Sequence, residues 1–157
     1  MTKTRATLDR KSEGGRLEQK WGKLAIQAGW LGLPSVLLQR QQALGLDPLD
    51  LNILLQIADH WWERENLPYP SKKSIAKRIG VDPRTVQRRI AQMEKDRLIQ
   101  RIPRHHSTGG SKTNIYSFEG LIREAEPYAQ EILNERETRK RTRSDRDTRK
   151  RPKLRVV

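Results

Sequence analysis

The fold is decided by residues 71–118, which read SKKSIAKRIGVDPRTVQRRIAQMEKDRLIQRIPRHHSTGGSKTNIYSF. The elements predicted here are a short helix at 71–79, a tight turn at 80–82, a basic helix at 83–96, and two β runs at 98–103 and 114–118 joined by a Gly-Gly loop. A helix of this size fits the major groove of B-DNA, and a charged β loop beside it can reach the backbone or the minor groove. The stretch therefore predicts a module that binds double-stranded DNA.

The spacing of small and apolar residues predicts that the two helices pack closely. Ala76 lets the second helix cross near the first, and Gly80 supplies the positive φ that a tight turn between helices requires. Asp82 followed by Pro83 is a strong helix start, because an N-cap side chain precedes a residue pre-set for helix. The expected inner face of the second helix is formed by Val86, Ile90 and Met93.

The outer face of the second helix carries the side chains expected to read bases. They are Arg84, Thr85, Gln87, Arg88 and Gln92. Arg pairs bidentately with guanine and Gln with adenine, and a helix that contacted only phosphates would not need two Gln beside its Arg. The alternative for Arg84 and Arg88 is an ordinary solvated charge. We assign Arg89, which is next to inward Ile90, to a DNA phosphate or to an intramolecular ion pair.

Two further regions are expected to contact the DNA backbone. The first helix begins at Ser71, Lys72 and Lys73, whose N–H groups and charges suit a phosphate. The alternative there is a capped surface turn. The loop between the β runs carries Arg104, His105, His106, Thr108, Ser111 and Lys112. This loop is expected to follow the minor groove or the backbone, and the alternative is a flexible hairpin.

The charge of the chain favours a polyanionic partner. The formal net charge is +14 and the pI is about 10.6, which is typical of nucleic-acid binding and less often of binding to an anionic membrane. Residues 136–157 hold 11 Lys/Arg and 3 Asp/Glu, so +8 lies in this tail and +6 in the rest. The tail alone therefore does not account for a specific DNA reader.

Composition and motifs exclude several other functions. The chain has no Cys, so disulfides, thiolate zinc sites and a cysteine nucleophile are absent. His105 and His106 would point to opposite faces of a strand, and no carboxylate accompanies them at ligand spacing, so we expect no metal. No phosphate loop, nucleophile elbow or metalloprotease motif is present. We therefore expect no enzyme, no catalytic residue and no cofactor, and a small-molecule effector is unsupported.

The rest of the chain is expected to extend a single domain. We expect a disordered N-terminus at 1–15 and a helix at 16–28. The domain is expected at 29–122, with helices at 35–44 and from Asp47 or Pro48 to Glu65. A C-terminal helix at 123–137 and a basic tail at 138–157, disordered or an extended charged arm, are expected to follow. No apolar run approaches the roughly 20 residues that span a bilayer, and the N-terminus lacks an apolar signal region. We expect a cytoplasmic, nucleoid-associated protein with no membrane partner.

Several segments resemble a known group of proteins. Residues 70–76, 80–86 and 96–99 resemble the winged helix-turn-helix of bacterial and phage regulators, and 113–122 is similar to the end of the wing in that group. The group includes MarR-like transcription factors and the DNA-binding domains of plasmid and phage replication initiators. The resemblance implies a mainly α fold with a small β-hairpin wing and N- and C-terminal helical extensions. Arg97 departs from the pattern, because relatives often have Gly or Asn there.

These observations favour a sequence-specific regulator of transcription that binds double-stranded DNA as a repressor. One small module reads few base pairs, so we expect a homodimer on a pseudo-palindrome. The dimer would use the N-terminal helix around Trp21, the C-terminal helix around Ile132 and Leu133, or both. One alternative is a replication initiation or accessory protein that binds origin repeats. Another is a structural or RNA-binding protein in which the basic tail does the binding.

Overall fold

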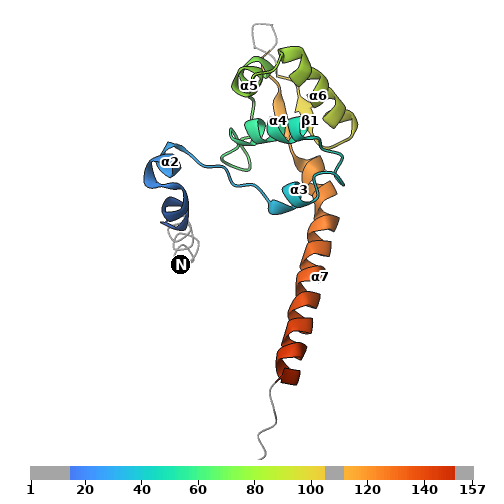
Figure 1. The fold of residues 1–157 in the computed structure, drawn as a ribbon. Coiled ribbons are helices and arrows are strands. Elements are labelled where there is room, and N and C mark those ends of the chain that lie inside the picture. The colour runs from blue at the N-terminus through green and yellow to red at the C-terminus, as the bar shows by residue number, and fades with distance from the viewer. Residues whose placement is uncertain (1–14, 105–111, 151–157) are drawn as a thin grey trace, which may run out of the picture. The chain divides into compact units, whose positions relative to one another are not determined.

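The computed structural model describes residues 15–104 and 112–150, with side chains up to residue 146 (Figure 1). The expected disorder of the N-terminus and of residues 151–157 concerns segments outside this part of the chain. The chain divides into two compact units, residues 1–33 and residues 34–157. Within the described ranges, no helix combines the length and hydropathy that crossing a bilayer requires.

In the first unit, the single helix expected at 16–28 is wrong, because Gly22 divides it. Residues 15–21 are helical and α2 spans Lys23–Ala28, while Gly22 between them has a φ of 87°. This φ lies outside the range of a right-handed helix, and glycine adopts it without steric cost. No residue of α2 is buried, and the side chains of Trp21 and Leu24 are 63% and 84% exposed.

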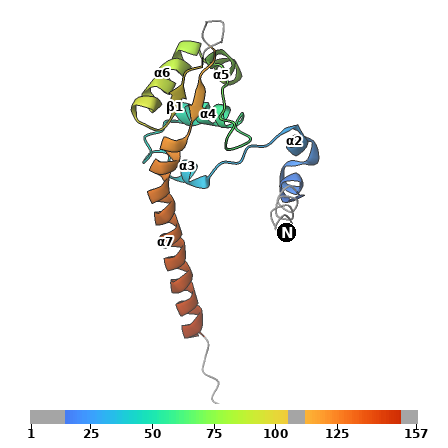
Figure 2. The same ribbon diagram turned by 180° about the vertical axis from the view of Figure 1, so that it is seen from behind.

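The second unit packs its helices against one another, with a small antiparallel sheet beside them (Figures 1 and 2). Its elements are α3 (Ser35–Gln39), α4 (Pro48–Ala58), α5 (Lys72–Ile79), α6 (Pro83–Lys95), β1 (Gln100–Ile102), β2 (Ile115–Ser117) and α7 (Glu119–Lys150). Strands β1 and β2 pair with Arg101 opposite Tyr116. The core is formed by the fully buried side chains of Ile53, Ile57, Ile75, Val86, Ile90, Met93 and Tyr116. This is the mainly α fold with a two-stranded wing that the sequence predicts.

Two helices are shorter than predicted because the chain turns back to bury apolar side chains. Helix α3 ends at Gln39 instead of residue 44, and turns at 40–45 bring Leu44 and Leu46 into the core. Helix α4 begins as predicted, since Asp47 and Asp50 form a capping box with N–H to carboxylate distances of 2.8 and 3.1 Å. It ends at Ala58 and does not reach residue 65.

The early end of α4 is explained by the aromatic residues that follow it. Beyond Ala58, the ring of Trp61 stacks on Phe118 at a centroid distance of 5.4 Å, whereas Trp62 is 71% exposed. A helix continued to residue 65 would keep the periodicity of its apolar stripe. The turn instead gives one of the two Trp rings an aromatic partner just before α7 begins.

The C-terminal helix is much longer than the predicted 123–137. Helix α7 runs through Pro127 to Lys150, so the expectation of a disordered tail is wrong for residues 138–150. That expectation rested on the lack of apolar residues. The polar segment nevertheless contains strong helix formers, an ion pair between Glu135 and Arg139 one turn apart at 3.9 Å, and a hydroxyl bond from Thr142 to the carbonyl of Thr138 at 3.0 Å.

Candidate nucleic-acid interface

Helices α5 and α6 form a helix-turn-helix whose ends are capped as the sequence predicts. The Ser71 hydroxyl accepts a hydrogen bond from the Ser74 N–H at 3.0 Å. Gly80 ends α5 in the left-handed conformation with φ 72°, and the Val81 N–H donates to the Ala76 carbonyl at 3.1 Å. The Asp82 carboxylate caps α6 by accepting from the backbone N–H at position 84 at 2.7 Å.

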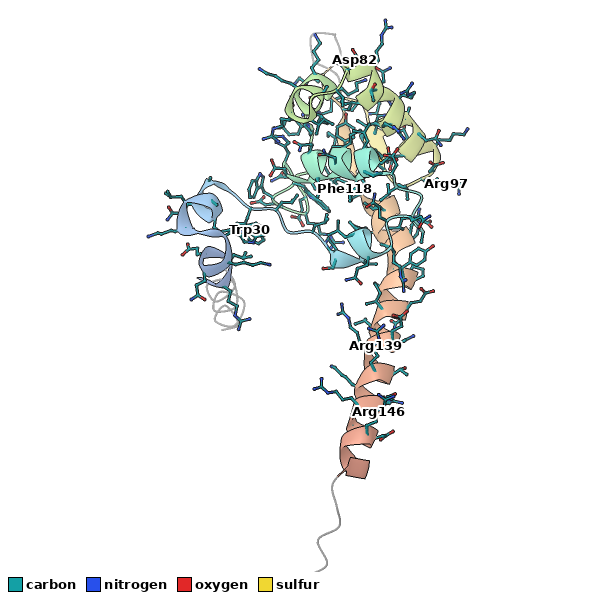
Figure 3. The ribbon with its side chains drawn as sticks, viewed as in Figure 1. Trp30, Asp82, Arg97, Phe118, Arg139 and Arg146 are labelled. Atoms are coloured by element: carbon teal, nitrogen blue, oxygen red, sulfur yellow. The ribbon has the colours of Figure 1, made fainter. Side chains whose placement is uncertain are left out.

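Helix α6 has a buried face and an exposed face. Val86 and Ile90 are completely buried and Met93 is 2% exposed, which fixes the rotation of the helix about its axis. The exposed face carries Arg84, Gln87, Arg88 and Gln92, with Thr85 half-buried at its edge. All five residues expected to read bases are therefore outside the core. Figure 3 labels Asp82 and Arg97, which mark the two ends of this helix.

Two of the base-reading candidates already have polar partners. The Lys72 ammonium donates to the Gln87 side-chain oxygen at 3.3 Å, which joins the start of α5 to the outer face of α6. The Gln92 amide donates to both carboxylate oxygens of Asp96 at 3.0 Å. Gln92 must break these bonds to meet a base. Arg84 and Arg88 lie nearer the start of α6, and this end of the helix is the one farther from α7 in both views (Figures 1 and 2).

Arg89 forms an intramolecular ion pair, which is one of the two assignments that the sequence leaves open for it. Its guanidinium contacts the carboxylate of Asp47 and lies 3.7 Å from that of Asp50. The reason is tertiary, because the capping box of α4 places two carboxylates beside α6. Burial raises the pKa of Asp50, and the negative charge of the neighbouring Asp47 raises it further.

The expected backbone contacts at the start of α5 lie next to the end of the wing. A depression of about 380 Å³ is lined by residues from both regions: Pro70, Ser71, Lys72, Lys73, Lys112, Thr113, Asn114 and Tyr116. Three lysines from segments some forty residues apart thus share one hollow with the N-terminal end of a helix. Lysine charges and helix N-termini are both features that attract phosphate.

Arg104 holds the base of the wing together. Its guanidinium donates to the carbonyl and hydroxyl oxygens of Thr113, both at 2.9 Å, and stacks over the ring of Tyr69 at 4.1 Å. The Lys112 N–H donates to the Arg104 carbonyl at 3.0 Å and closes the loop. The predictions for His105, His106, Thr108 and Ser111 lie outside the described residues.

A contact that sequence reasoning missed fixes the wing to the end of α6. The Glu94 carboxylate accepts from the backbone N–H of Arg101 at 3.0 Å and from its guanidinium Nε at 2.7 Å, with a further bond from Nη2. The side-chain hydrogen bond from Arg101 holds the pKa of Glu94 below its ordinary value. No local pattern signals this pair, because the partners belong to a helix and to a strand.

The connection between α6 and β1 holds Arg97 in the left-handed conformation, which Gly and Asn adopt more easily than Arg. Arg97 has a φ of 60°, and it is the one non-glycine residue with positive φ among those described. A Cβ added to Gly120 would lie 1.9 Å from the Arg97 carbonyl oxygen, and the Leu121 N–H donates to the Leu98 carbonyl at 2.7 Å. The start of α7 therefore presses directly on this turn, which requires glycine at position 120.

Residues 44–99 match the sequence model of a helix-turn-helix domain. Among solved structures, the N-terminal domain of DnaD protein from Geobacillus kaustophilus HTA426 is similar at a TM-score of 0.53 and 18% identity, covering 72% of this chain and 91% of that one. A possible transcriptional regulator from Methanosarcina mazei Go1 aligns at 0.42 and 21%, covering 65% and 82%. YusO protein from Bacillus subtilis aligns at 0.38 and 18%, covering 96% and 100%. No curated protein sequence matches the chain.

The fold and the matched domain confirm the resemblance stated from the sequence. The chain contains a winged helix-turn-helix domain, with α6 in the position of the recognition helix and β1 and β2 as the wing. The presence of this domain is evidence that the protein binds DNA. Among the described residues, no group of three His, Cys, Asp or Glu side chains gathers as a metal site would need.

Proposed function

We propose that this protein is a sequence-specific regulator that binds double-stranded DNA and represses transcription by occupying an operator. The observation that carries the proposal is the division of α6 into two faces. Val86, Ile90 and Met93 anchor one face in the core, so Arg84 and Arg88 are held outward on a rigid element. A rigid helix that presents Arg and Gln is suited to reading guanine and adenine in the major groove.

Phosphate contacts would set the register of α6 on the duplex. Ser71, Lys72 and Lys73 at the start of α5 share a depression with Lys112 at the end of the wing. Contacts within this one depression would hold a stretch of the phosphate backbone beside the groove that α6 enters. Such contacts position a protein on DNA without specifying its sequence.

The functional unit in this proposal is a homodimer. The first part of α7 exposes Ile122 and Leu133, which are 56% and 51% exposed and lie eleven residues apart, close to three helical turns. Leu38 on α3 is 56% exposed, and α3 packs on α7. A second copy would cover this apolar strip. Light scattering during size-exclusion chromatography tests the dimer, and a monomer both free and on DNA would exclude it.

Selection of bound sequences from random duplexes tests the proposed function. A pseudo-palindrome is expected, with two half-sites about one helical turn apart. Recovery of direct repeats would favour the alternative of a replication initiation or accessory protein. Recovery of no sequence preference at physiological salt would overturn the role of α6 in reading bases.

A further inference from the structure

The distal half of α7 is a cationic helix, and its described side chains from residue 136 to residue 146 are all exposed. Arg40, the residue that follows α3, forms ion pairs with α7 at Glu131 (3.8 Å) and Glu135 (3.1 Å). Beyond them the helix continues to Lys150, and both ribbon views show it leaving the domain alone (Figures 1 and 2). Figure 3 shows Arg139 and Arg146 on this segment.

Five of the six basic side chains described in this segment lie on one face. Arg136, Arg139, Lys140, Arg143 and Arg146 follow one another at intervals of one or three residues, and all five are exposed. With 3.6 residues per turn, these positions form one stripe, whereas Glu137, Arg141 and Asp145 fall on the opposite side. We refer to the five residues as the cationic stripe. Like charges on one helix face repel each other, so an anionic surface would relieve this repulsion.

The composition of the segment shows which polyanion it suits. Residues 134–151 contain no apolar side chain. A coiled-coil partner would need apolar residues at regular spacing, and a helix lying on a membrane would need an apolar face. The core of a protein interface is also depleted of charged residues. A stripe of mostly arginine with no apolar residue fits the phosphates of a nucleic acid.

The place of the stripe in the domain indicates a separate piece of DNA. In both ribbon views, α5 and α6 lie at one end of residues 34–150 and the distal half of α7 extends from the other (Figures 1 and 2). A duplex under α6 therefore does not reach the stripe. The five residues span about 15 Å along the helix axis, which matches about four phosphates of one strand.

We propose that the cationic stripe of α7 is a second DNA-binding surface, which holds the backbone of a duplex segment other than the one read by α6. This inference rests on the proposed function for the first segment. The stripe would bind without sequence preference, and its affinity would depend strongly on salt because each phosphate contact releases counterions. One molecule would then join two DNA segments, one read by sequence and one held by charge.

A two-duplex capture experiment tests the proposal with the full-length protein. Protein is loaded on a bead-bound duplex, and capture of a labelled duplex of unrelated sequence is measured between 50 and 200 mM salt. The variant Arg143→Gln/Arg146→Gln should capture less, with the slope of log affinity against log salt reduced by about two. The control Arg123→Gln/Arg141→Gln removes the same charge from two exposed positions on the other face of α7 and should behave like the wild type. These positions share one face because they are eighteen residues, or five turns, apart.

A second variant separates this proposal from the function of α6. Arg84→Ala/Arg88→Ala should lose sequence preference and keep stripe-dependent binding to a random duplex. If the Arg84→Ala/Arg88→Ala variant keeps its sequence preference while Arg143→Gln/Arg146→Gln loses capture of the second duplex, the proposed role of α6 is wrong and the role of the cationic stripe is supported. Equal capture by Arg143→Gln/Arg146→Gln and by its control would contradict the proposal that the cationic stripe binds a second duplex. The proposal would also be contradicted if the stripe variant bound single-stranded RNA or vesicles of anionic lipid more weakly than the wild type but captured duplex DNA equally well. Circular dichroism of both double variants should match the wild type, because Gln preserves helix propensity.

Discussion

Helix α6 and the distal half of α7 are both basic helices, but they are held in opposite ways. Helix α6 buries Val86, Ile90 and Met93, so the core sets which side chains face outward. The distal half of α7 buries nothing, and its described residues beyond Leu133 are all exposed. Base reading requires side chains positioned on a rigid element, while phosphate attraction requires only charge. Burial, and not basicity, therefore separates a helix suited to reading bases from a helix suited only to holding the DNA backbone.

The largest expected effect comes from removing the anchor of α6. Ile90→Ala should lower the free energy of unfolding by about 2–5 kcal/mol, because a fully buried side chain leaves a cavity in the core. Thr142→Ala in distal α7 should change it by less than about 0.5 kcal/mol, as an exposed surface substitution does. Urea unfolding followed by circular dichroism measures both. Similar losses at the two positions would contradict the contrast between the helices.

The root of α7, unlike its distal half, is part of the core. Gly120→Ala should destabilise the domain by about 1–3 kcal/mol, since the new Cβ would meet the Arg97 carbonyl oxygen and force the turn to move. Gly15→Ala, where an added Cβ meets nothing within 4 Å, is the matched control and should be close to neutral. Thermal unfolding compares the two, and a neutral Gly120→Ala would show that the turn yields easily.

Two cations of α6, Arg88 and Lys95, should contribute differently to the base preference. Arg88→Ala should cost about 1–3 kcal/mol on the selected site and relax the base preference there. Lys95→Ala, at the exposed end of α6, should leave that preference unchanged. Binding to the selected site and to a scrambled duplex at one salt concentration measures both. Equal losses on the two duplexes for Arg88→Ala would place Arg88 on a phosphate.

The turn that ends α6 carries local strain that one substitution should release. Arg97→Gly should raise the free energy of unfolding by about 0.5–1 kcal/mol, since a left-handed φ costs an L residue about 1–2 kcal/mol and glycine gives part of that back as unfolded-state entropy. Chemical denaturation measures the gain. Asp96→Gly, at a residue with φ of −78°, is the control and should not stabilise the domain.

The smallest expected effect is the pH dependence of the contact between α6 and the wing. Arg101 lowers the pKa of Glu94, so the contact stabilises the fold at neutral pH and is lost as the pH falls below about 4.3, the ordinary value for glutamate. Glu94→Gln should therefore show a shallower loss of stability over this range than the wild type. Denaturation at pH 7, 5, 4 and 3 provides the profile, and parallel curves would mean that Glu94 does not contribute.

The sequence predicts the helix-turn-helix well because its signals are local. Ser71, Gly80 and Asp82 form caps and a turn with neighbours within a few residues, and the apolar spacing of α6 predicts its buried face. The lengths of α3 and α4 were overestimated for the opposite reason. Those helices end where the chain turns to bury Leu44 or to stack Trp61 on Phe118, which are contacts that helical periodicity does not contain.

The residues by themselves determined the order of elements, the capped turn between α5 and α6 and the outward face of α6, because each depends on a few consecutive positions. Tertiary structure alone decided that Arg89 pairs with Asp47 and that Glu94 ties α6 to the wing. It also decided that the polar residues after 137 continue a helix, so that scattered charges form a stripe. The physical reason is distance along the chain, since ion pairs and packing join segments whose approach only the folded core creates.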